Sequence, residues 1–238
     1  MITELLESRE LPGQPAADTC LLYLVRHGTT TLNRENRYRG RRDIPLDAQG
    51  YQDAVDAARC LSHAGLAAVY TSPLRRAIAT AQIIADEGRV PDLRILHGLT
   101  NVDYGAWEGM TAEEAVMFDP EAFALYKASP SRAVCPLGER LSDAKHRVIE
   151  ALELIASRHR GEAVVAITHA VMIRLVFVWI TGIDDETWRR PVGRGSVIAF
   201  YAKGSQLCLA EWPEGRGAMA EGSADGPGDQ APREKAPG

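Results

Sequence analysis

The distribution of apolar residues along the chain predicts a regular alternation of strands and helices. Unbroken apolar runs, which are typical of strands buried on both faces, occupy residues 21–25, 66–70 and 163–168. Apolar residues at helical spacing predict helices over residues 48–63, 74–86, 139–160 and 170–181. A closing hairpin is expected over residues 196–201 and 206–211. This order predicts an α/β fold, namely a three-layer α/β/α sandwich with a mainly parallel central sheet.

Local signals at the helix ends support these boundaries. Asp47 is a favourable N-cap for the first helix, and Gly65 stops the segment before the second strand. Ser72 followed by Pro73 predicts another helix start, because serine caps well and proline suits the first helical position. Gly161 is expected to end the longest helix just before the third strand.

The length of 238 residues suits one domain with peripheral ends. We predict a single domain over residues 20–212, with residues 1–19 as a peripheral extension. Residues 213–238 contain no Ile, Leu, Val, Phe, Tyr or Trp. Such a segment buries too little apolar surface to offset the entropy lost on ordering, so we predict that this tail is disordered.

Composition and charge argue against several kinds of partner, namely nucleic acid, structural zinc and membranes. The chain has 32 acidic residues against 27 Lys and Arg, and its net charge of −5 opposes nucleic-acid binding through overall charge. The four cysteines form no C-x-x-C pair, so structural zinc has no signature and reduced thiols are expected. The N-terminus lacks the features of a secretory signal, and the apolar stretch at 170–180 is short and interrupted by Arg174. We therefore expect a soluble cytoplasmic protein with no membrane or nucleic-acid partner.

Basic side chains follow each of the three predicted parallel strands. Arg26, His27 and Gly28 follow the first strand, Arg76 lies shortly after the second, and His169 follows the third. The carboxyl ends of parallel strands meet at one edge of a sheet, so these side chains should converge there. Neutral imidazole is a competent nucleophile toward phosphorus, and guanidinium groups bind phosphoryl oxygens bidentately. The other histidines lack such neighbours and are expected at the surface, at positions 63, 97, 146 and 159.

Several segments taken together resemble the motifs of the histidine phosphatase superfamily, which contains the cofactor-dependent phosphoglycerate mutases and many phosphatases. In chain order they are LVRHG at 24–28, NRYRG at 36–40, DIPL at 43–46, SPLRRA at 72–77, YGAWEG at 104–109, PLGE at 136–139 and TH at 168–169. Any one such motif has a substantial false-positive risk, but here they occur in order over residues 21–201. The resemblance implies the same phosphoglycerate mutase-like sandwich that the apolar pattern predicts.

The resemblance also implies a role for each matching residue. His27 would be the phosphorylated nucleophile, and Arg26 and Arg76 would bind its phosphoryl group. His169 would be a second donor to the phosphoryl oxygens. The implied substrate-binding positions are Asn33, Arg39, Gly40 and Tyr104. No metal or cofactor is expected, because arginine and histidine supply the positive charge that Mg²⁺ supplies in other phosphoryl-transfer enzymes.

The third motif departs from the family pattern at Asn101. The family usually has Leu-x-Glu here, and the Glu gives a proton to the leaving oxygen, which an amide cannot do. Asp103 can replace it, since residues two apart in extended chain point the same way, with Glu108 a weaker candidate. Otherwise the leaving group needs no acid, as with an acyl phosphate or pyrophosphate, or the chain binds its ligand without turnover. We favour Asp103 as the catalytic acid and Asn101 as a substrate-binding residue, although Asp103 could equally be a loop carboxylate paired with an arginine.

The resemblance favours the phosphatase branch, because mutases use a longer basic segment than the one between Trp107 and Gly138 to hold a second phosphate. We therefore predict a phosphoric monoester hydrolase that acts on a phosphorylated small molecule through a phosphohistidine. A mutase-like phosphotransferase and a catalytically weakened phospho-ligand-binding member are the alternatives. A basic cluster suits a multiply anionic substrate or is simply solvated, and it comprises Arg37, Arg39, Arg41 and Arg42. The substrate and the oligomeric state, a homodimer included, are left open.

Overall fold

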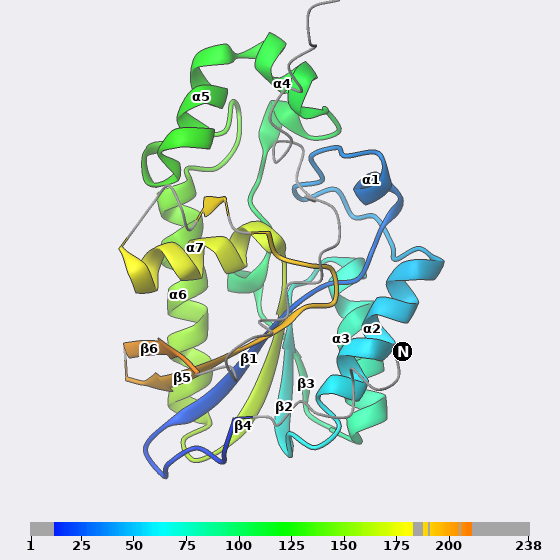
Figure 1. Cartoon of the computed structure of the whole chain (residues 1–238), viewed down its shortest axis with the longest axis vertical. Coiled ribbons are helices and arrows are strands. Elements are labelled where there is room, and N and C mark those ends of the chain that lie inside the picture. Colours follow the sequence, from blue (N-terminus) through cyan, green and yellow to red (C-terminus); the bar gives the residue numbers. More distant parts are fainter. Residues whose placement is uncertain (1–11, 183–187, 190, 205, 211–238) are drawn as a thin grey trace, which may run out of the picture.

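In the computed structural model, which describes residues 12–182, 188–189, 191–204 and 206–210, a six-stranded sheet lies between two layers of helices (Figure 1). The strands are β1 (Cys20–Arg26), β2 (Leu66–Thr71), β3 (Leu93–Ile95), β4 (Ala163–Thr168), β5 (Val197–Lys203) and β6 (Gln206–Leu209). Their order across the sheet is β3-β2-β4-β1-β5-β6. Neighbours among β3, β2, β4 and β1 are parallel, whereas β5 and β6 pair in antiparallel fashion. The predicted mainly parallel sheet is confirmed.

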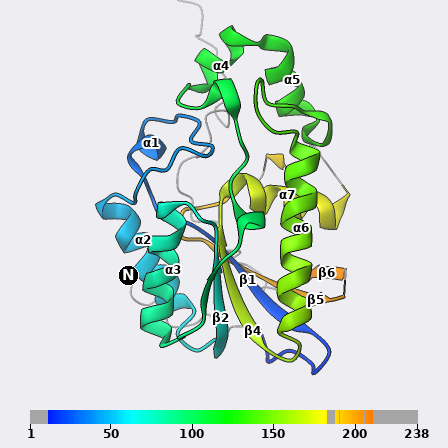
Figure 2. The same ribbon diagram turned by 180° about the vertical axis from the view of Figure 1, so that it is seen from behind.

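Two pairs of helices cover the two faces of the sheet. Helices α2 (Ala48–Cys60) and α3 (Arg75–Gly88) lie on one face, and α6 (Leu141–Arg158) and α7 (Ala170–Thr181) lie on the other (Figures 1 and 2). Successive residues of β1 alternate between the two apolar clusters, with Leu22 and Leu24 in one and Tyr23 in the other. Both faces of β1 are therefore buried, which explains its unbroken apolar run and confirms the three-layer architecture.

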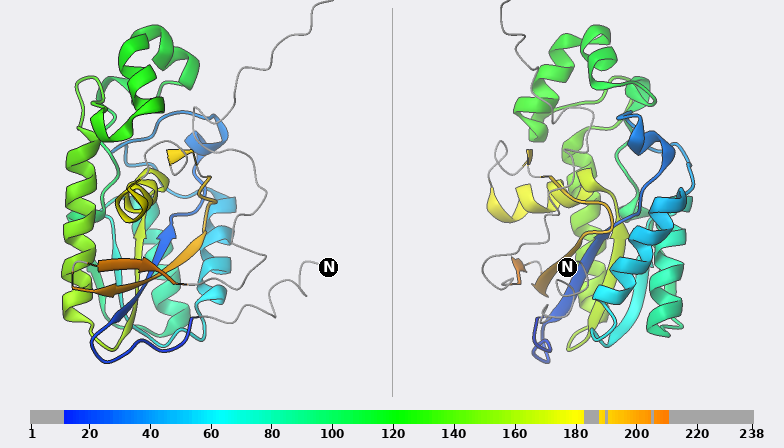
Figure 3. Two further views of the ribbon diagram at one scale, coloured as in Figure 1. Left: turned by 60° about the vertical axis from the view of Figure 1, so that its left-hand side comes forward. Right: turned by 45° about the vertical axis from the view of Figure 1, so that its right-hand side comes forward.

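A third group of helices extends the molecule beyond the carboxyl ends of the parallel strands. It consists of α4 (Ala112–Phe118) and α5 (Pro120–Ala128), which lie above the sheet in Figure 3. The remaining helix, α1 (Thr31–Arg34), follows β1. Short 3₁₀ turns are found at His97–Leu99, Gly105–Trp107 and Pro130–Arg132. These short helices and turns lie near the carboxyl ends of the parallel strands, and the apolar pattern did not predict them.

One predicted helix boundary is correct and another is wrong. Asp47 caps α2 as expected, because its carboxylate accepts the Gly50 N–H at 2.9 Å. Helix α3, however, begins at Arg75 and not directly after Ser72. The Arg75 N–H donates to the carboxylate of Asp43 at 2.7 Å, so the stabilising acceptor comes from a loop 32 residues earlier. The Ser72–Pro73 pair is a local sequence signal, and it could not show that Asp43 would stabilise the start of this helix.

Residues 12–19, the described part of the predicted N-terminal extension, contact the edge of the domain through a few hydrogen bonds. The Tyr201 hydroxyl donates to the carbonyl of Gly13 at 3.1 Å, and the Gly161 N–H donates to the carbonyl of Thr19 at 2.8 Å. Residues 1–11 and the predicted tail at 213–238 lie outside the described residues, so the domain limits stay a prediction.

All four cysteines are free thiols. No helix in the described ranges is both long and apolar enough to cross a membrane.

The expectation that four histidines lie at the surface is correct for three of them and wrong for His159. His159 is buried at the end of α6, where its Nε2 lies 2.9 Å from the Tyr70 hydroxyl. Its Nδ1 lies 2.7 Å from the carboxylate of Glu162. Glu162 is close in sequence, but Tyr70 lies on β2, 89 positions earlier, so only the assembled fold brings it to His159.

Candidate active site

Three adjacent strands end at the same edge of the sheet and place their following residues together. Arg26 at the end of β1 lies opposite Thr168 at the end of β4, and Thr71 of β2 lies opposite Ile167. The His27 N–H continues the ladder by donating to the carbonyl of Thr168 at 3.1 Å. The residues that follow β1, β2 and β4 therefore meet at one site, as the order of the predicted strands required.

The two nitrogens of the His27 imidazole have different partners. Nδ1 lies 2.6 Å from the carbonyl oxygen of Gly28, and Nε2 accepts a hydrogen bond from Arg76 Nε at 3.2 Å. A carbonyl oxygen can only accept, so Nδ1 carries the hydrogen and Nε2 keeps a lone pair. His27 therefore presents Nε2, in the nucleophilic form, toward a guanidinium group.

Burial and charge keep both site histidines neutral. The pKa of His27 is held well below its ordinary value of 6.5 by burial and by the positive charges of Arg76, Arg26 and Arg39. Burial and the charges of Arg76 and Arg39 do the same to the pKa of His169. Each imidazole thus remains uncharged near neutral pH, because protonation would add a buried charge beside existing cations.

Ser72 positions the second histidine. The His169 Nε2 lies 2.9 Å from the Ser72 hydroxyl, and the His27 and His169 rings lie edge to face with centroids 5.0 Å apart. The Nδ1 of His169 is buried and makes no hydrogen bond within the described part of the chain. The sequence assigned Ser72 to a helix cap and missed this contact. Its place directly after β2 is the signal that identifies it, by the same rule that selected His27 and His169.

The two arginines are fully buried beside these histidines. Arg76 donates from Nη1 to the carbonyl of Arg42 at 2.7 Å and from Nη2 to the carbonyl of Gly40 at 2.9 Å. Burial, helped by the charge of Arg39, lowers the pKa of Arg76 to about 9. Arg26 donates to the carbonyl of Val192. Two buried guanidinium groups next to neutral imidazoles form a site whose positive charge a phosphoryl group would neutralise.

Close backbone contacts surround the nucleophile. A Cβ on Gly28 would stand 2.2 Å from the carbonyl oxygen of Gly50, so glycine is required for α2 to approach the end of β1. Gly40 has φ of +52°, and its carbonyl accepts from both Arg76 and the Asn101 amide, the latter at 3.1 Å. The loop that contains Gly40 is thereby held against the arginine that faces His27.

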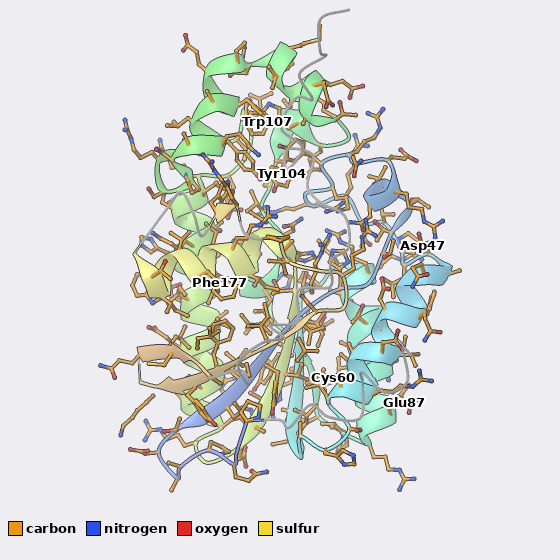
Figure 4. All side chains as sticks on the ribbon, viewed as in Figure 1. Asp47, Cys60, Glu87, Tyr104, Trp107 and Phe177 are labelled. Carbon is orange, nitrogen blue, oxygen red and sulfur yellow. The ribbon has the colours of Figure 1, made fainter. Side chains whose placement is uncertain are left out.

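The other three expected substrate-binding residues, Asn33, Arg39 and Tyr104, differ in burial and in hydrogen-bond partners. Asn33 accepts from the Thr30 N–H at 2.9 Å, and its amide nitrogen is buried without a hydrogen-bond partner in the described residues. Arg39 is half-buried and lies near enough to affect the pKa of both histidines. Tyr104 is buried in an aromatic cluster that also contains Trp107 (Figure 4), and its hydroxyl lies 2.9 Å from that of Tyr126. Burial raises the pKa of Tyr104 to about 12.

The candidate acids are half-buried, and each already has a hydrogen-bond partner. The Asp103 carboxylate accepts the Gly105 N–H at 2.9 Å and lies 3.5 Å from the Arg41 guanidinium. Glu108 accepts the backbone N–H of Arg41 at 2.6 Å. Neither carboxylate has a recorded hydrogen bond to His27 among the described residues. The structure therefore places both candidates beside the loop around Arg41.

An arginine that the sequence did not single out holds the segment that carries Asn101. The Arg147 guanidinium of α6 donates to the carbonyls of Thr100 at 2.6 Å and Asn101 at 2.9 Å. It also pairs with Glu139 at 2.8 Å. Among the residues that the structure describes, no group of three or more His, Cys, Asp or Glu side chains is arranged to hold a metal ion. The polar groups of the site are thus mainly arginine, histidine and amide.

Comparison with known proteins identifies the family. The model of the histidine phosphatase superfamily (branch 1) matches residues 22–214. The chain is 32% identical over 163 residues to phosphoserine phosphatase 1 of Hydrogenobacter thermophilus, covering 68% of this chain and 77% of that protein. It is 31% identical over 199 residues to a 2,3-bisphosphoglycerate-dependent phosphoglycerate mutase of Azorhizobium caulinodans, covering 80% and 96%. The solved structure of Bacillus stearothermophilus YhfR has a TM-score of 0.74 at 35% identity, covering 80% of this chain and 95% of that one. From its motifs, its fold and these matches, the chain belongs to the histidine phosphatase superfamily and to its phosphatase branch.

Proposed function

We propose that this phosphatase hydrolyses a phosphomonoester, or a similar phosphorylated small molecule, through a phosphohistidine on His27 Nε2, without a metal or cofactor. The observation that carries the proposal is the pair of contacts on the His27 ring. Gly28 accepts from Nδ1 at 2.6 Å, and Nε2 faces Arg76 at 3.2 Å. A neutral, oriented imidazole whose unprotonated Nε2 faces a guanidinium is suited to attack a phosphoryl group that this guanidinium binds.

The chemistry proceeds in two displacements. The Nε2 lone pair of His27 attacks phosphorus, the bond from phosphorus to the leaving oxygen breaks, and its electron pair departs with that oxygen. Arg26 and Arg76 stabilise the equatorial oxygens, and His169 adds a hydrogen bond from one ring N–H. Water then attacks phosphorus, the P–N bond breaks, and His27 regains its lone pair as inorganic phosphate leaves.

A mutase-like phosphotransfer is the second candidate, because one relative at 31% identity is named a phosphoglycerate mutase. A mutase needs a second phosphate site, and residues 108–137 of this chain contain only two basic residues, Lys127 and Arg132. Hydrolysis is therefore the leading proposal. The two differ in a simple assay, since mutase activity on a phosphoglycerate depends on a bisphosphate primer and phosphate release does not.

The nucleophile is tested by phosphate release from para-nitrophenyl phosphate. His27→Ala should lower turnover roughly 10⁴-fold or more, because it removes the covalent step. His97→Ala, at an exposed histidine, is the matched control and should leave turnover unchanged. A labelled substrate should leave an acid-labile phosphoryl adduct on wild type and not on His27→Ala. Turnover without such an adduct would contradict the proposal.

Asp103 as the proton donor remains a prediction. If it holds, Asp103→Asn should lower turnover of an alkyl phosphate by about 10²-fold or more and affect para-nitrophenyl phosphate less, since para-nitrophenolate leaves without a proton. Glu108→Gln provides the same test for the weaker candidate. Equal rates for both variants and wild type on the alkyl phosphate would exclude both carboxylates as acids.

A further inference from the structure

Among the residues that the structure describes, the buried polar side chains around His27 include no carboxyl group. At this edge of the sheet they are Arg26, Thr29, Thr30, Asn33, Thr71, Ser72, Arg76, Thr80, Asn101, Thr168 and His169. Amides, hydroxyls and neutral imidazole can donate hydrogen bonds, but near neutral pH they do not give up a proton. His169 is in this neutral form, because burial and Arg76 hold its pKa well below 6.5. Arg76, whose pKa is lowered to about 9, stays protonated near neutral pH as the cation beside His27.

The carboxyl groups of Asp103, Glu108 and Asp43, which lie on the loops around this site, are engaged as hydrogen-bond acceptors. Asp103 accepts from the Gly105 N–H at 2.9 Å, and Glu108 accepts from the Arg41 N–H at 2.6 Å. Asp43 accepts from the Arg75 N–H at 2.7 Å. Each of these oxygens is directed at a backbone N–H outside the immediate surroundings of His27. None of the three carboxyl groups has a recorded hydrogen bond to His27, Arg76 or Asn101 among the described residues.

Positive charge predominates around His27, whose pKa is lowered by burial and by Arg76, Arg26 and Arg39. The Asn101 amide and Arg76 both donate to the carbonyl of Gly40, at 3.1 and 2.9 Å, so the wall beside the phosphoryl site is an amide and a guanidinium. Arg39 precedes this glycine, and its charge acts on both histidines and on Arg76, where the charges of Asp43 and Glu108 offset part of it. Fixed cations stabilise a leaving group that departs as an anion, and they do so without proton transfer.

We propose that the substrate carries its phosphoryl group on an acidic oxygen, as in a diphosphate or an acyl phosphate, and not on an alcohol. This inference rests on the proposed function and specifies its substrate class. The His27 Nε2–P bond forms as the P–O bond breaks, and the electron pair leaves on a phosphate or carboxylate anion, with no proton moved in that step. Water then attacks phosphorus, the P–N bond returns its electron pair to His27, and the proton from water passes to solvent.

Wild-type enzyme provides the first test. Its kcat/KM for acetyl phosphate or inorganic pyrophosphate should exceed that for O-phosphoserine and glycerol phosphate by about 10²-fold or more, because only the alcohols need the missing acid. Acetyl phosphate and pyrophosphate distinguish a carboxylate from a phosphate leaving group. A series of aryl phosphates of similar shape tests the same point without large differences in substrate binding. Its rate should rise steeply as the leaving phenol becomes more acidic.

Variants at Asn101 provide the second test. Asn101→Glu introduces a protonatable group beside Arg76, and Asn101→Gln is the matched control of the same size with no acid. Asn101→Glu should raise the ratio of kcat/KM for alkyl phosphates to kcat/KM for acetyl phosphate by about 10²-fold, with a new decline at higher pH for the alkyl phosphates. Asn101→Gln should give no such gain. If Asn101→Glu does not fold, as judged by circular dichroism, the wild-type aryl series decides the question alone.

The outcomes separate this inference from the proposed function. Equal wild-type kcat/KM for O-phosphoserine and acetyl phosphate, or a shallow aryl series, would overturn the substrate class while hydrolysis through His27 stands. A selective loss of alkyl phosphate turnover in Asp103→Asn would do the same and assign the acid to Asp103. Absence of the acid-labile adduct on His27 with every substrate would instead overturn the proposed function.

Discussion

Acidification should destabilise the fold through the two histidines of the active site. His27 and His169 are each 1% exposed, and burial with the charge of Arg76 holds both pKa values well below 6.5. In the unfolded chain both imidazoles titrate at their ordinary pKa of about 6.5. Below that pH the unfolded state binds more protons than the native state. Stability is therefore full above about pH 6.5 and falls as the pH drops from there toward the native pKa values.

As long as both imidazoles stay neutral in the native state, the loss of stability equals the free energy that proton binding to these histidines gives the unfolded chain. Between about pH 7 and about pH 5.5, one unfolded histidine gains about 1.3 kcal/mol of proton-binding free energy. The pair should therefore lower the free energy of unfolding by about 2.5 kcal/mol over this interval. Domains are usually stable by about 5–15 kcal/mol in total, so this is a large and measurable fraction.

Urea-induced unfolding across this pH range measures the loss. Phosphate-free buffer is needed, since an anion bound to the native site adds stability by mass action. His27→Asn and His169→Asn should each remove about 1.3 kcal/mol of the pH-dependent loss, and the double variant should remove most of it. His63→Asn, at an exposed histidine, controls for loss of an imidazole. A double variant that loses stability in parallel with wild type would refute the argument from burial.

Three substitutions test the packing around the site. Gly28→Ala should cost about 1–3 kcal/mol in urea unfolding, because its Cβ would stand 2.2 Å from the Gly50 carbonyl oxygen. An unchanged midpoint would contradict the close approach of α2. Asp47→Ala should cost about 1 kcal/mol by removing the cap on Gly50, whereas Asp47→Ser should retain most of it. Equal losses in the two variants would show that the cap is not the cause. Arg147→Met should cost about 2–3 kcal/mol, because it leaves three carbonyls and Glu139 without their donor. Arg147→Lys should restore part of this loss, and a variant as stable as wild type would contradict a holding role.

The main helices and all described strands except β3, which the apolar pattern did not predict, were predictable because their signals are local. Each buried strand is a continuous apolar run, since both faces of the sheet are covered. The start of α3 was not predictable in this way. Its first N–H, that of Arg75, is stabilised by Asp43 from a loop, and the hydroxyl of Ser72, the apparent cap, lies 2.9 Å from His169 Nε2.

The members of the candidate site were also largely predictable, but their chemical state was not. Parallel strands bring their carboxyl ends to one edge, so the residues after β1, β2 and β4 had to meet once those strands were recognised. The Nδ1 contact of His27, the Ser72 contact of His169 and the support from Arg147 depend on side-chain directions that no spacing encodes. The same holds for Asp103, whose carboxylate lies against Gly105 and not in a recorded contact with the nucleophile.

The amino-acid sequence by itself determined the order of strands and helices and the set of histidines and arginines at the sheet edge, because periodicity and strand order are properties of the chain. The tertiary structure alone decided which imidazole nitrogen is free, which carboxylates are engaged, and that both histidines are neutral. These properties depend on burial and on neighbours far away in sequence, as when Arg76 contacts His27 across 49 positions. A pKa and a hydrogen-bond partner belong to an environment, and the environment exists only after the chain has folded.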